Sequence, residues 1–321
     1  MNSTELDAAG VFDPVLREAY LRCRALNAEH GRTYFLATRL LTPGQRPAVH
    51  ALYGFARWAD DIVDEPCAGP ADTARRLDDL SHELTRGLAE GASEHPTLAA
   101  LVHTVRRYGI DTTLFADFLR SMRMDLTVRD YPNRAALDGY MRGSAEVIGL
   151  QMLPVLGTVC PPANAEPYAA ALGKAFQLTN FLRDVAEDLE RDRVYLPADE
   201  LAAHGVDREL LRWCSHRERI EPRVRKALAE QHSVTKEIYR YARAGIALLH
   251  PVSRPCIETA ATLYSGILDE IEHADFAVFA HRARVGTGRR ITVAAGALAR
   301  AWWVRRGGRG VGTAPAREGM G

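Results

Sequence analysis

An all-helical fold in a single domain is the architecture that the sequence predicts. Two stretches far apart in the chain, at 49–65 and 177–191, place polar residues three and four positions apart, which is the spacing of one helix face. The segments around them also read as helices, and no stretch of the 321-residue chain reads as an interdomain linker. We therefore expect one helical domain at 12–306, a flexible arm at 1–11 and a disordered, glycine-rich tail at 307–321.

The first of these stretches carries a row of acids on an otherwise apolar helix. Tyr53, Arg57, Asp60 and Asp64 fall on one face, and Asp61 lies just beside it. A plain structural interpretation pairs Arg57 with Asp60 inside the helix, for only ~0.2–0.5 kcal/mol. We favour a phosphate-facing Arg57 held by Asp60, because Tyr53 and Asp64 share its face.

The second stretch repeats the pattern with Gln177, Asn180, Asp184, Asp188 and Arg191, again flanked by large apolar residues. Buried carboxylates are costly unless they are paired or bind a metal ion. The row therefore either lines a cavity that holds cations or forms a structural ion-pair network. Oxygen ligands suit hard cations, Mg²⁺ above all, so two facing rows would hold several Mg²⁺ ions around a diphosphate.

Together, FARWADDIVDE and QLTNFLRDVAEDLERDRVYLP resemble the signature pair of the squalene/phytoene synthase family. The order is the same, and the resemblance runs from about His30 to Phe276. It implies a class I isoprenoid synthase fold, with helices packed around a central cavity. It also implies that two geranylgeranyl diphosphates are joined head to head, through a cyclopropyl diphosphate, to phytoene in carotenoid biosynthesis.

The resemblance also implies roles for individual residues. Asp60, Asp64, Asp184 and Asp188 would hold Mg²⁺, or Mn²⁺ in its place, supported by Asp61, Asn180 and Glu187; NADPH is not expected. The residues expected to contact the diphosphate substrates are Arg32, Thr33, Tyr53, Arg57, Gln177, Asn180, Arg183, Arg193 and Tyr195. Tyr140 and Tyr264 match catalytic aromatic positions, since an aromatic face attracts a carbocation by ~0.5–2 kcal/mol. Asp125 matches an acidic position near the cavity.

The remaining elements follow in order. A helix at 14–29 precedes a turn at 30–35, and Thr42 with Gln45 predicts a capping box that starts the helix of the first acid row. Further helices are predicted at 73–88, 96–108, 112–124, 137–159, 166–189, 200–204, 208–214, 222–244 and 256–274. Small residues in 137–159 fit close helix packing or room for an isoprenoid chain. Arg142 and the Ala145–Glu146 pair depart from the family pattern there, which bears on the product.

The composition and the targeting signals limit the partners and the cellular location that the sequence predicts. The formal net charge is zero, so nucleic acid is not an indicated partner. The five cysteines show no Cys-x-x-Cys spacing, which argues against a zinc site or a disulfide framework and favours a reducing cytoplasm. The N-terminus lacks a signal-peptide pattern, and no apolar run approaches the ~20 residues of a membrane span. A basic segment with Trp302 and Trp303 suits either a bilayer surface or docking on the domain; we expect a monomer or homodimer.

Three other functions remain open at this point. The nearest is a presqualene diphosphate or squalene-type synthase that uses farnesyl diphosphate. The Asp60–Asp64 motif alone would also fit a chain-elongating prenyltransferase or a terpene cyclase, but the second block argues against both. A non-catalytic helical scaffold would be expected to lack intact acid rows.

Overall fold

The described part of the chain is helical throughout. The computed structural model describes residues 3–65, 69–286, 288, 292, 293 and 298. Within these residues, β pairing is limited to two isolated bridges, Asp130–Val194 and Thr158–Leu249. The predicted all-helical class is confirmed. The predictions for Trp302, Trp303 and the tail at 307–321 fall outside the described residues.

The helices alternate with short connections along the chain. Their bounds are α1 Ser3–Ala8, α2 Pro14–His30, α3 Arg32–Thr38, α4 Arg46–Val63, α5 Pro70–Glu90, α6 Pro96–Tyr108, α7 Thr113–Thr127, α8 Arg134–Met141, the π-helical turn η1 Arg142–Glu146, α9 Val147–Leu156, α10 Pro162–Arg183, α11 Val185–Glu190, α12 Ala198–Ala203, α13 Arg208–His216, α14 Pro222–Ala244, the 3-10 turn η2 Gly245–Leu248 and α15 Arg254–His273. None of the described helices has the length and apolar character that crossing a bilayer requires.

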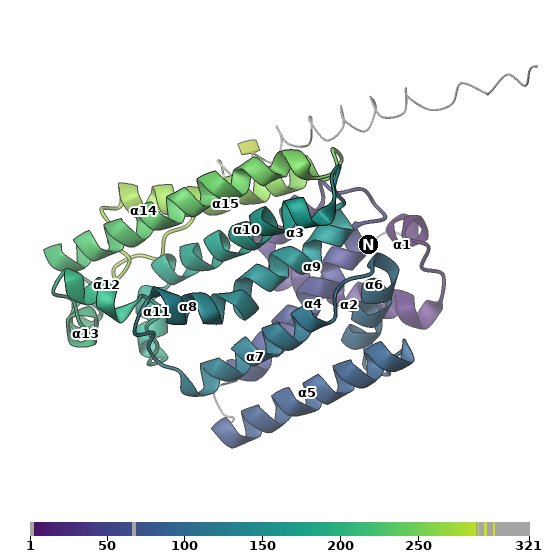
Figure 1. Cartoon of the computed structure of the whole chain (residues 1–321), viewed down its shortest axis with the longest axis horizontal. Helices are drawn as coiled ribbons and strands as arrows, with labels where there is room; N and C mark the ends of the chain where they lie inside the picture. The colour runs from purple at the N-terminus through teal and green to yellow at the C-terminus, as the bar shows by residue number, and fades with distance from the viewer. Residues whose placement is uncertain (1–2, 66–68, 287, 289–291, 294–297, 299–321) are drawn as a thin grey trace, which may run out of the picture.

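Two packed groups of helices flank the middle of the molecule (Figure 1). On one side α4 packs against α2, α6 and α7, and α5 covers α7 along the outer edge. On the other side α10 packs against α14 and α15, which lie next to each other along the opposite edge. Helix α9 contacts both α4 and α10. Each group has its own apolar core, so α4, α9 and α10 form the walls between the cores.

The N-terminal residues are packed, whereas we expected a flexible arm at 1–11. Leu6, Ala9 and Val11 are buried against Tyr20 of α2 in a separate small core. Glu5 of α1 also accepts a hydrogen bond of 2.5 Å from Arg46. The expectation is therefore wrong for residues 3–11, because three apolar side chains in this short segment find buried contacts.

The helix of the first acid row begins later than predicted. It starts at Arg46 rather than at Thr42. Gln45 Oε1 accepts from the Thr42 backbone N–H at 3.2 Å, as in a capping box, but it also accepts from the Thr42 hydroxyl at 2.7 Å, which is not a capping-box contact. The other end of the Gln45 amide donates to the Val155 carbonyl and to Ser253 Oγ. The capping residues thus fasten the start of α4 to α9 and α15. The predicted turn at 30–35 is instead mostly helix α3.

Candidate active site

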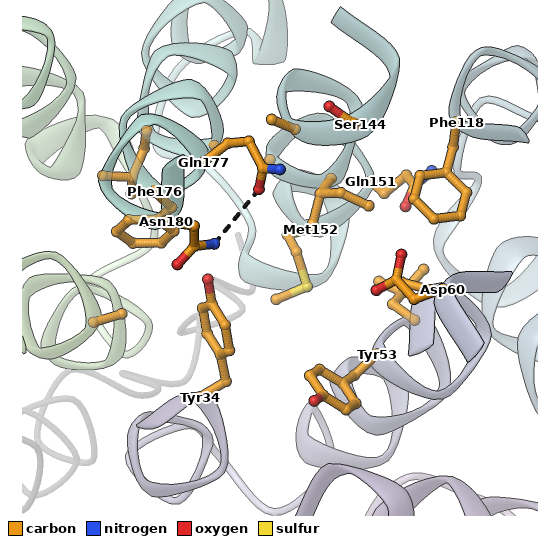
Figure 2. A pocket seen from close by; sticks show the side chains of 18 of the residues that line it. Tyr34, Tyr53, Asp60, Phe118, Ser144, Gln151, Met152, Phe176, Gln177 and Asn180 are labelled. Carbon is orange, nitrogen blue, oxygen red and sulfur yellow. Dashed lines mark hydrogen bonds between the residues drawn. The ribbon is translucent and has the colours of Figure 1, made fainter. Parts of the chain in front are cut away.

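A cavity of about 580 Å³ lies between α4, α9 and α10. Helix α4 contributes residues from Val49 to Val63, a length of about 21 Å at 1.5 Å per residue, and Asp64 follows directly. On both α4 and α10, the lining residues near the N-terminal end of the helix are mostly apolar, and those near its C-terminal end are mostly polar. The cavity therefore has a charged mouth and an apolar interior. Figure 2 shows Tyr53 and Asp60 of α4 facing Gln177 and Asn180 of α10 across it.

Most of the predicted site residues meet at this cavity. Those that line it are Tyr53, Arg57, Asp60, Asp64, Tyr140, Gln177, Asn180, Arg183, Asp184, Glu187, Asp188, Arg193 and Tyr195. Thr33, Asp61 and Tyr264 do not appear in its lining, and of Arg32 the structure describes only the backbone, in α3. The two acid rows, about 120 residues apart in the chain, are brought to the same mouth.

Two arginines connect the rows directly. Asp64 follows the last residue of α4, and its carboxylate pairs with Arg191 at 3.0 Å and with Arg193 at 3.8 Å. Within α4, Arg57 pairs with Asp61, one full turn further on, and not with Asp60 as the sequence predicted. Residues four positions apart are neighbours on a helix surface, which brings the Asp61 carboxylate within reach of the guanidinium. Asp60 is left without an ion pair among the described residues.

The second row is not carried by one continuous helix, as predicted for 166–189. Helix α10 ends at Arg183, and Asp184 leaves helical geometry at φ −105° and ψ 17° before α11 begins at Val185. The Asp188 N–H still donates to the Asp184 carbonyl at 2.8 Å. This bond carries the register across the break, so the predicted row still faces the cavity.

Asp184 is held by two guanidinium groups. Arg183 donates to both of its carboxylate oxygens at 2.7 and 2.5 Å, and Arg282 does the same at 2.8 and 3.0 Å. Arg282 also pairs with Glu187 at 3.1 Å. Sequence reasoning missed Arg282 as a site residue, because it lies in an irregular segment after α15 with no periodic pattern to mark it.

The carboxyl groups of the mouth differ in their pKa values. Burial, with the charge of Asp64, raises the pKa of Asp60 to about 7. Burial, with the charge of Asp184, raises the pKa of Asp188 to about 8. For Asp184, burial also opposes ionisation, but the hydrogen bonds from its two arginines outweigh it and lower the pKa. Asp60 and Asp188 therefore hold negative charge at a cost that a bound cation would remove.

A buried hydrogen-bond network adjoins the first row. Asp125 is only 5% exposed, and its carboxylate accepts from Tyr140 Oη at 2.8 Å and from Tyr195 Oη at 2.9 Å. Its backbone carbonyl accepts from Arg193 at 3.0 Å. Burial raises the pKa of Asp125, against the opposing effect of Arg193. The network fixes two aromatic rings and one arginine of the cavity wall in place.

Aromatic rings form the opposite wall. Tyr34 of α3 lines the cavity and points toward Asn180 (Figure 2). Tyr264 lies behind it, with ring centroids 4.9 Å apart, and also contacts Phe176 at 4.6 Å. Tyr264 was predicted as a cavity residue, but the closer ring is Tyr34. The sequence offered no signal for Tyr34 beyond its place in a polar, aromatic segment.

The oxygen atoms at the mouth of the cavity are suitable ligands for a hard cation. The amide oxygen Asn180 Oδ1 is buried and has no hydrogen-bond partner among the described residues, and Asp60 and Asp188 make no ion pair there. Carboxylate and amide oxygens are ligands that Mg²⁺ accepts. However, no group of three or more His, Cys, Asp or Glu side chains in the described residues is gathered closely enough to hold an ion by itself. Other ligands, such as substrate oxygens, would have to complete a site.

Comparison with known sequences gives a consistent family. The squalene/phytoene synthase family model matches residues 27–289. A phytoene synthase of Arthrospira platensis is 35% identical over 288 residues, which cover 85% of this chain and 90% of the relative. Phytoene synthase 1, chloroplastic, of Arabidopsis thaliana is 38% identical over 282 residues, which cover 86% of this chain and 65% of the relative.

Solved structures share the fold. A dehydrosqualene synthase in complex with ligand matches with a TM-score of 0.81 at 24% identity, over 88% of this chain and 96% of the other. Squalene synthase HpnC of Alicyclobacillus acidocaldarius matches with a TM-score of 0.75 at 23% identity, over 84% and 98%. The predicted class I isoprenoid synthase fold is confirmed. With the family model and these sequence relatives covering most of its length, the chain belongs to the squalene/phytoene synthase family.

Proposed function

We propose that this chain joins two geranylgeranyl diphosphates head to head and converts the cyclopropyl diphosphate intermediate to phytoene, releasing two diphosphates. The observation that carries the proposal is the meeting of both acid rows at the mouth of a single, otherwise apolar cavity. Sequence relatives named phytoene synthase support this choice of product. The reaction is a prenyl transfer followed by a rearrangement. Each step begins by ionising a carbon–diphosphate bond and ends with the loss of one proton.

The charged mouth is suited to binding diphosphate together with divalent cations. Its carboxyl groups are Asp60, Asp64, Asp125, Asp184, Glu187 and Asp188, and its guanidinium groups are those of Arg57, Arg183, Arg191, Arg193 and Arg282. Asp60, Asp64, Asp184, Asp188 and Asn180 would hold Mg²⁺ or Mn²⁺, with Glu187 in support. When bound, the ions neutralise the charge that builds on the departing diphosphate.

The arginines and amides would hold the substrate. Arg57 and Arg193 each have a buried Nε without a hydrogen-bond partner among the described residues, so each retains a donor. Guanidinium groups match phosphate oxygens in geometry as well as in charge. Gln177 and Asn180, which face Tyr53 across the mouth, would orient the diphosphate oxygens (Figure 2). Fixing the carbon–oxygen bond that breaks keeps each ionisation directed toward the interior.

The apolar interior would protect the cations that form. Leu153, Leu156 and Leu249 line the deep part of the cavity, and they leave little for water to bind. Tyr34, Phe176 and Tyr140 also line the cavity. An aromatic face attracts a nearby carbocation, so these rings would stabilise the allylic and rearranging cations.

One assay tests the proposal. Farnesyl and geranylgeranyl diphosphates are supplied separately with Mg²⁺, with and without NADPH, and the hydrocarbon product is identified by mass spectrometry. We expect phytoene from geranylgeranyl diphosphate without reductant. Squalene formed from farnesyl diphosphate only when NADPH is present would overturn the proposal in favour of the squalene-type alternative.

A further inference from the structure

The carboxylate of Asp184 has no free oxygen for a metal ion. Each of its two oxygens accepts one hydrogen bond from Arg183 and one from Arg282, all between 2.5 and 3.0 Å. Glu187, one turn further along the second row, shares Arg282 at 3.1 Å. Asp188 in the same row makes no ion pair among the described residues. A cation approaching this row therefore meets one open carboxylate and one occupied carboxylate.

Of the two arginines, Arg282 is the one that can leave. Arg183 is the last residue of α10, and its side chain is only 17% exposed, so releasing it would leave a buried charge unpaired. The Arg282 side chain is 38% exposed and sits in irregular structure after α15, where water can solvate it. Partly exposed pairs of this kind are weak enough to exchange with a competing ion.

The segment that carries Arg282 does not need to move with it. Phe276, Val278 and Phe279 are buried in the core that α10, α14 and α15 share, and Asp275 pairs with Arg225 of α14. The anchor lies three to seven residues before Arg282. Rotation of one long side chain is therefore sufficient to open Asp184, while the backbone stays packed.

We propose that Arg282 is a resident counter-ion of the metal site: it occupies Asp184 and Glu187 in the ion-free protein and must leave before a divalent cation binds there. Arg282 thereby sets the cation concentration at which the second row fills. This inference rests on the ion-binding role that the proposed function gives to Asp184. It assigns a competing role to a residue outside both acid rows.

A metal titration without substrate tests the inference. Mn²⁺ alone is added to the full chain, and free Mn²⁺ is followed by its EPR signal. Arg282→Gln should lower the apparent Kd for Mn²⁺ by about threefold to tenfold, because the competing guanidinium is gone. Arg282→Lys, which cannot form the paired hydrogen bonds, should lower it by about twofold. If Arg282→Gln fails to fold, Arg282→Lys still tests the inference.

The matched control is Arg284→Gln. Arg284 lies on the same segment, is exposed and makes no ion pair among the described residues, so its removal changes the net charge equally. If Arg284→Gln lowers the Kd as much as Arg282→Gln, or if the Kd of both Arg282 variants equals that of the wild type, the counter-ion role is refuted. If no protein binds Mn²⁺, with or without inorganic pyrophosphate, the ion-binding part of the proposed function is refuted as well.

Discussion

At the scale of single residues, the four aspartates of the acid rows fall into two kinds. Asp64 and Asp184 are neutralised by arginines, whereas Asp60 and Asp188 are half-buried beside other acids and have raised pKa values. A group that is costly to ionise in the folded state destabilises the fold when the pH lies above its unfolded pKa. Function and stability therefore place opposite demands on Asp60 and Asp188, but not on Asp184.

This difference gives a paired prediction. Asp60→Asn and Asp184→Asn should each lower turnover by about a thousandfold, since each removes a negative ligand for the ions that stabilise the leaving diphosphate. At pH 8, Asp60→Asn should raise the urea midpoint of unfolding, and Asp184→Asn should lower it because Arg183 and Arg282 lose their partner. Steady-state rates and urea titrations measure both.

The control is Asp72→Asn, which removes a carboxylate from α5, away from the cavity lining. It should leave turnover within about twofold of the wild type, as surface substitutions generally do little. Wild-type turnover in both Asp60→Asn and Asp184→Asn would show that the rows do not act in the reaction.

A second residue-scale prediction concerns the buried carboxylate of Asp125. It holds the hydroxyl of Tyr140, so Asp125→Ala, which removes the acceptor, and Tyr140→Phe, which removes the donor, break the same hydrogen bond. Each should lower kcat by about tenfold with little change in KM, because ring placement affects the rearranging cation more than substrate binding. The double variant should be no slower than the slower single variant, since the effects of coupled residues do not add. Fully multiplicative losses would mean that the two residues act separately.

What the sequence could predict about the site follows from periodicity. The rows through Asp60 and Asp184 were predictable, because spacing on a helix places side chains on one face wherever the helix lies. The partners of those residues were not. Arg57 was expected to pair with Asp60 but pairs with Asp61, and Arg282 reaches Asp184 from 98 residues away in the chain. Such contacts depend on tertiary packing, which spacing does not encode.

At the scale of elements, close packing between α9 and α10 shapes one wall of the cavity. A Cβ added at Gly149 would lie 2.1 Å from the Ala169 carbonyl oxygen, and one added at Gly173 would lie 2.3 Å from that of Ala145. Both neighbours are backbone atoms, so the helices would have to separate. Of the small residues at 137–159 that were predicted to serve either packing or cavity space, Gly149 serves packing, and both Gly149 and Gly173 also line the cavity.

Gly149→Ala should therefore destabilise the protein by about 1–3 kcal/mol, the usual cost of overpacking. Gly139→Ala is the matched control: this exposed glycine in α8 has open space around its Cβ position, so alanine should stabilise the helix by about 0.5–1 kcal/mol. Chemical unfolding of both variants measures the difference. Equal effects of the two substitutions would mean that α9 and α10 are not in tight contact.

Helix boundaries were predictable only where a local signal sets them. Proline at the start of α2, α5, α6 and α14 and glycine after α5 and α6 agree with observed ends to within a few residues. The break at Asp184 had no such signal, since QLTNFLRDVAEDLE reads as one helix. Of the two arginines on its carboxylate, Arg282 is a tertiary partner that the sequence pattern does not reveal.

At the scale of the whole molecule, the cavity lies between two apolar cores, and several polar side chains are buried where the helices pack. The family resemblance and the helical pattern predicted the architecture, but not which polar residues would be enclosed. His50 is an example: it lies on the first acid helix, is 2% exposed, stacks on Phe35 and accepts a hydrogen bond from the Asn27 amide at 3.0 Å. An isolated histidine in a sequence carries no signal for such burial.

The burial of His50 makes the stability of the fold depend on pH. Burial, together with the charges of Arg24 and Arg46, lowers the pKa of His50 to about 3. A histidine with an unfolded pKa near 6.5 then binds a proton only when the chain unfolds, so its stabilising contribution is complete above about pH 6.5 and is lost as the pH falls toward 3. Between pH 7 and pH 5 this one group should remove about 2 kcal/mol from the free energy of unfolding.

His50→Gln isolates this contribution. Glutamine cannot titrate and keeps a polar group beside Asn27. When the pH is lowered from 7 to 5, the free energy of unfolding of the variant should therefore fall by about 2 kcal/mol less than that of the wild type. Urea titrations at both values measure the change, and His216→Gln, at an exposed position of α13, should retain the wild-type dependence. An unchanged slope in His50→Gln would place the acid sensitivity of the fold in other groups. The free energy of unfolding depends on pH because a neutral imidazole is enclosed where α4 packs against α2. The group that makes the fold sensitive to acid therefore lies on the same helix as the first acid row.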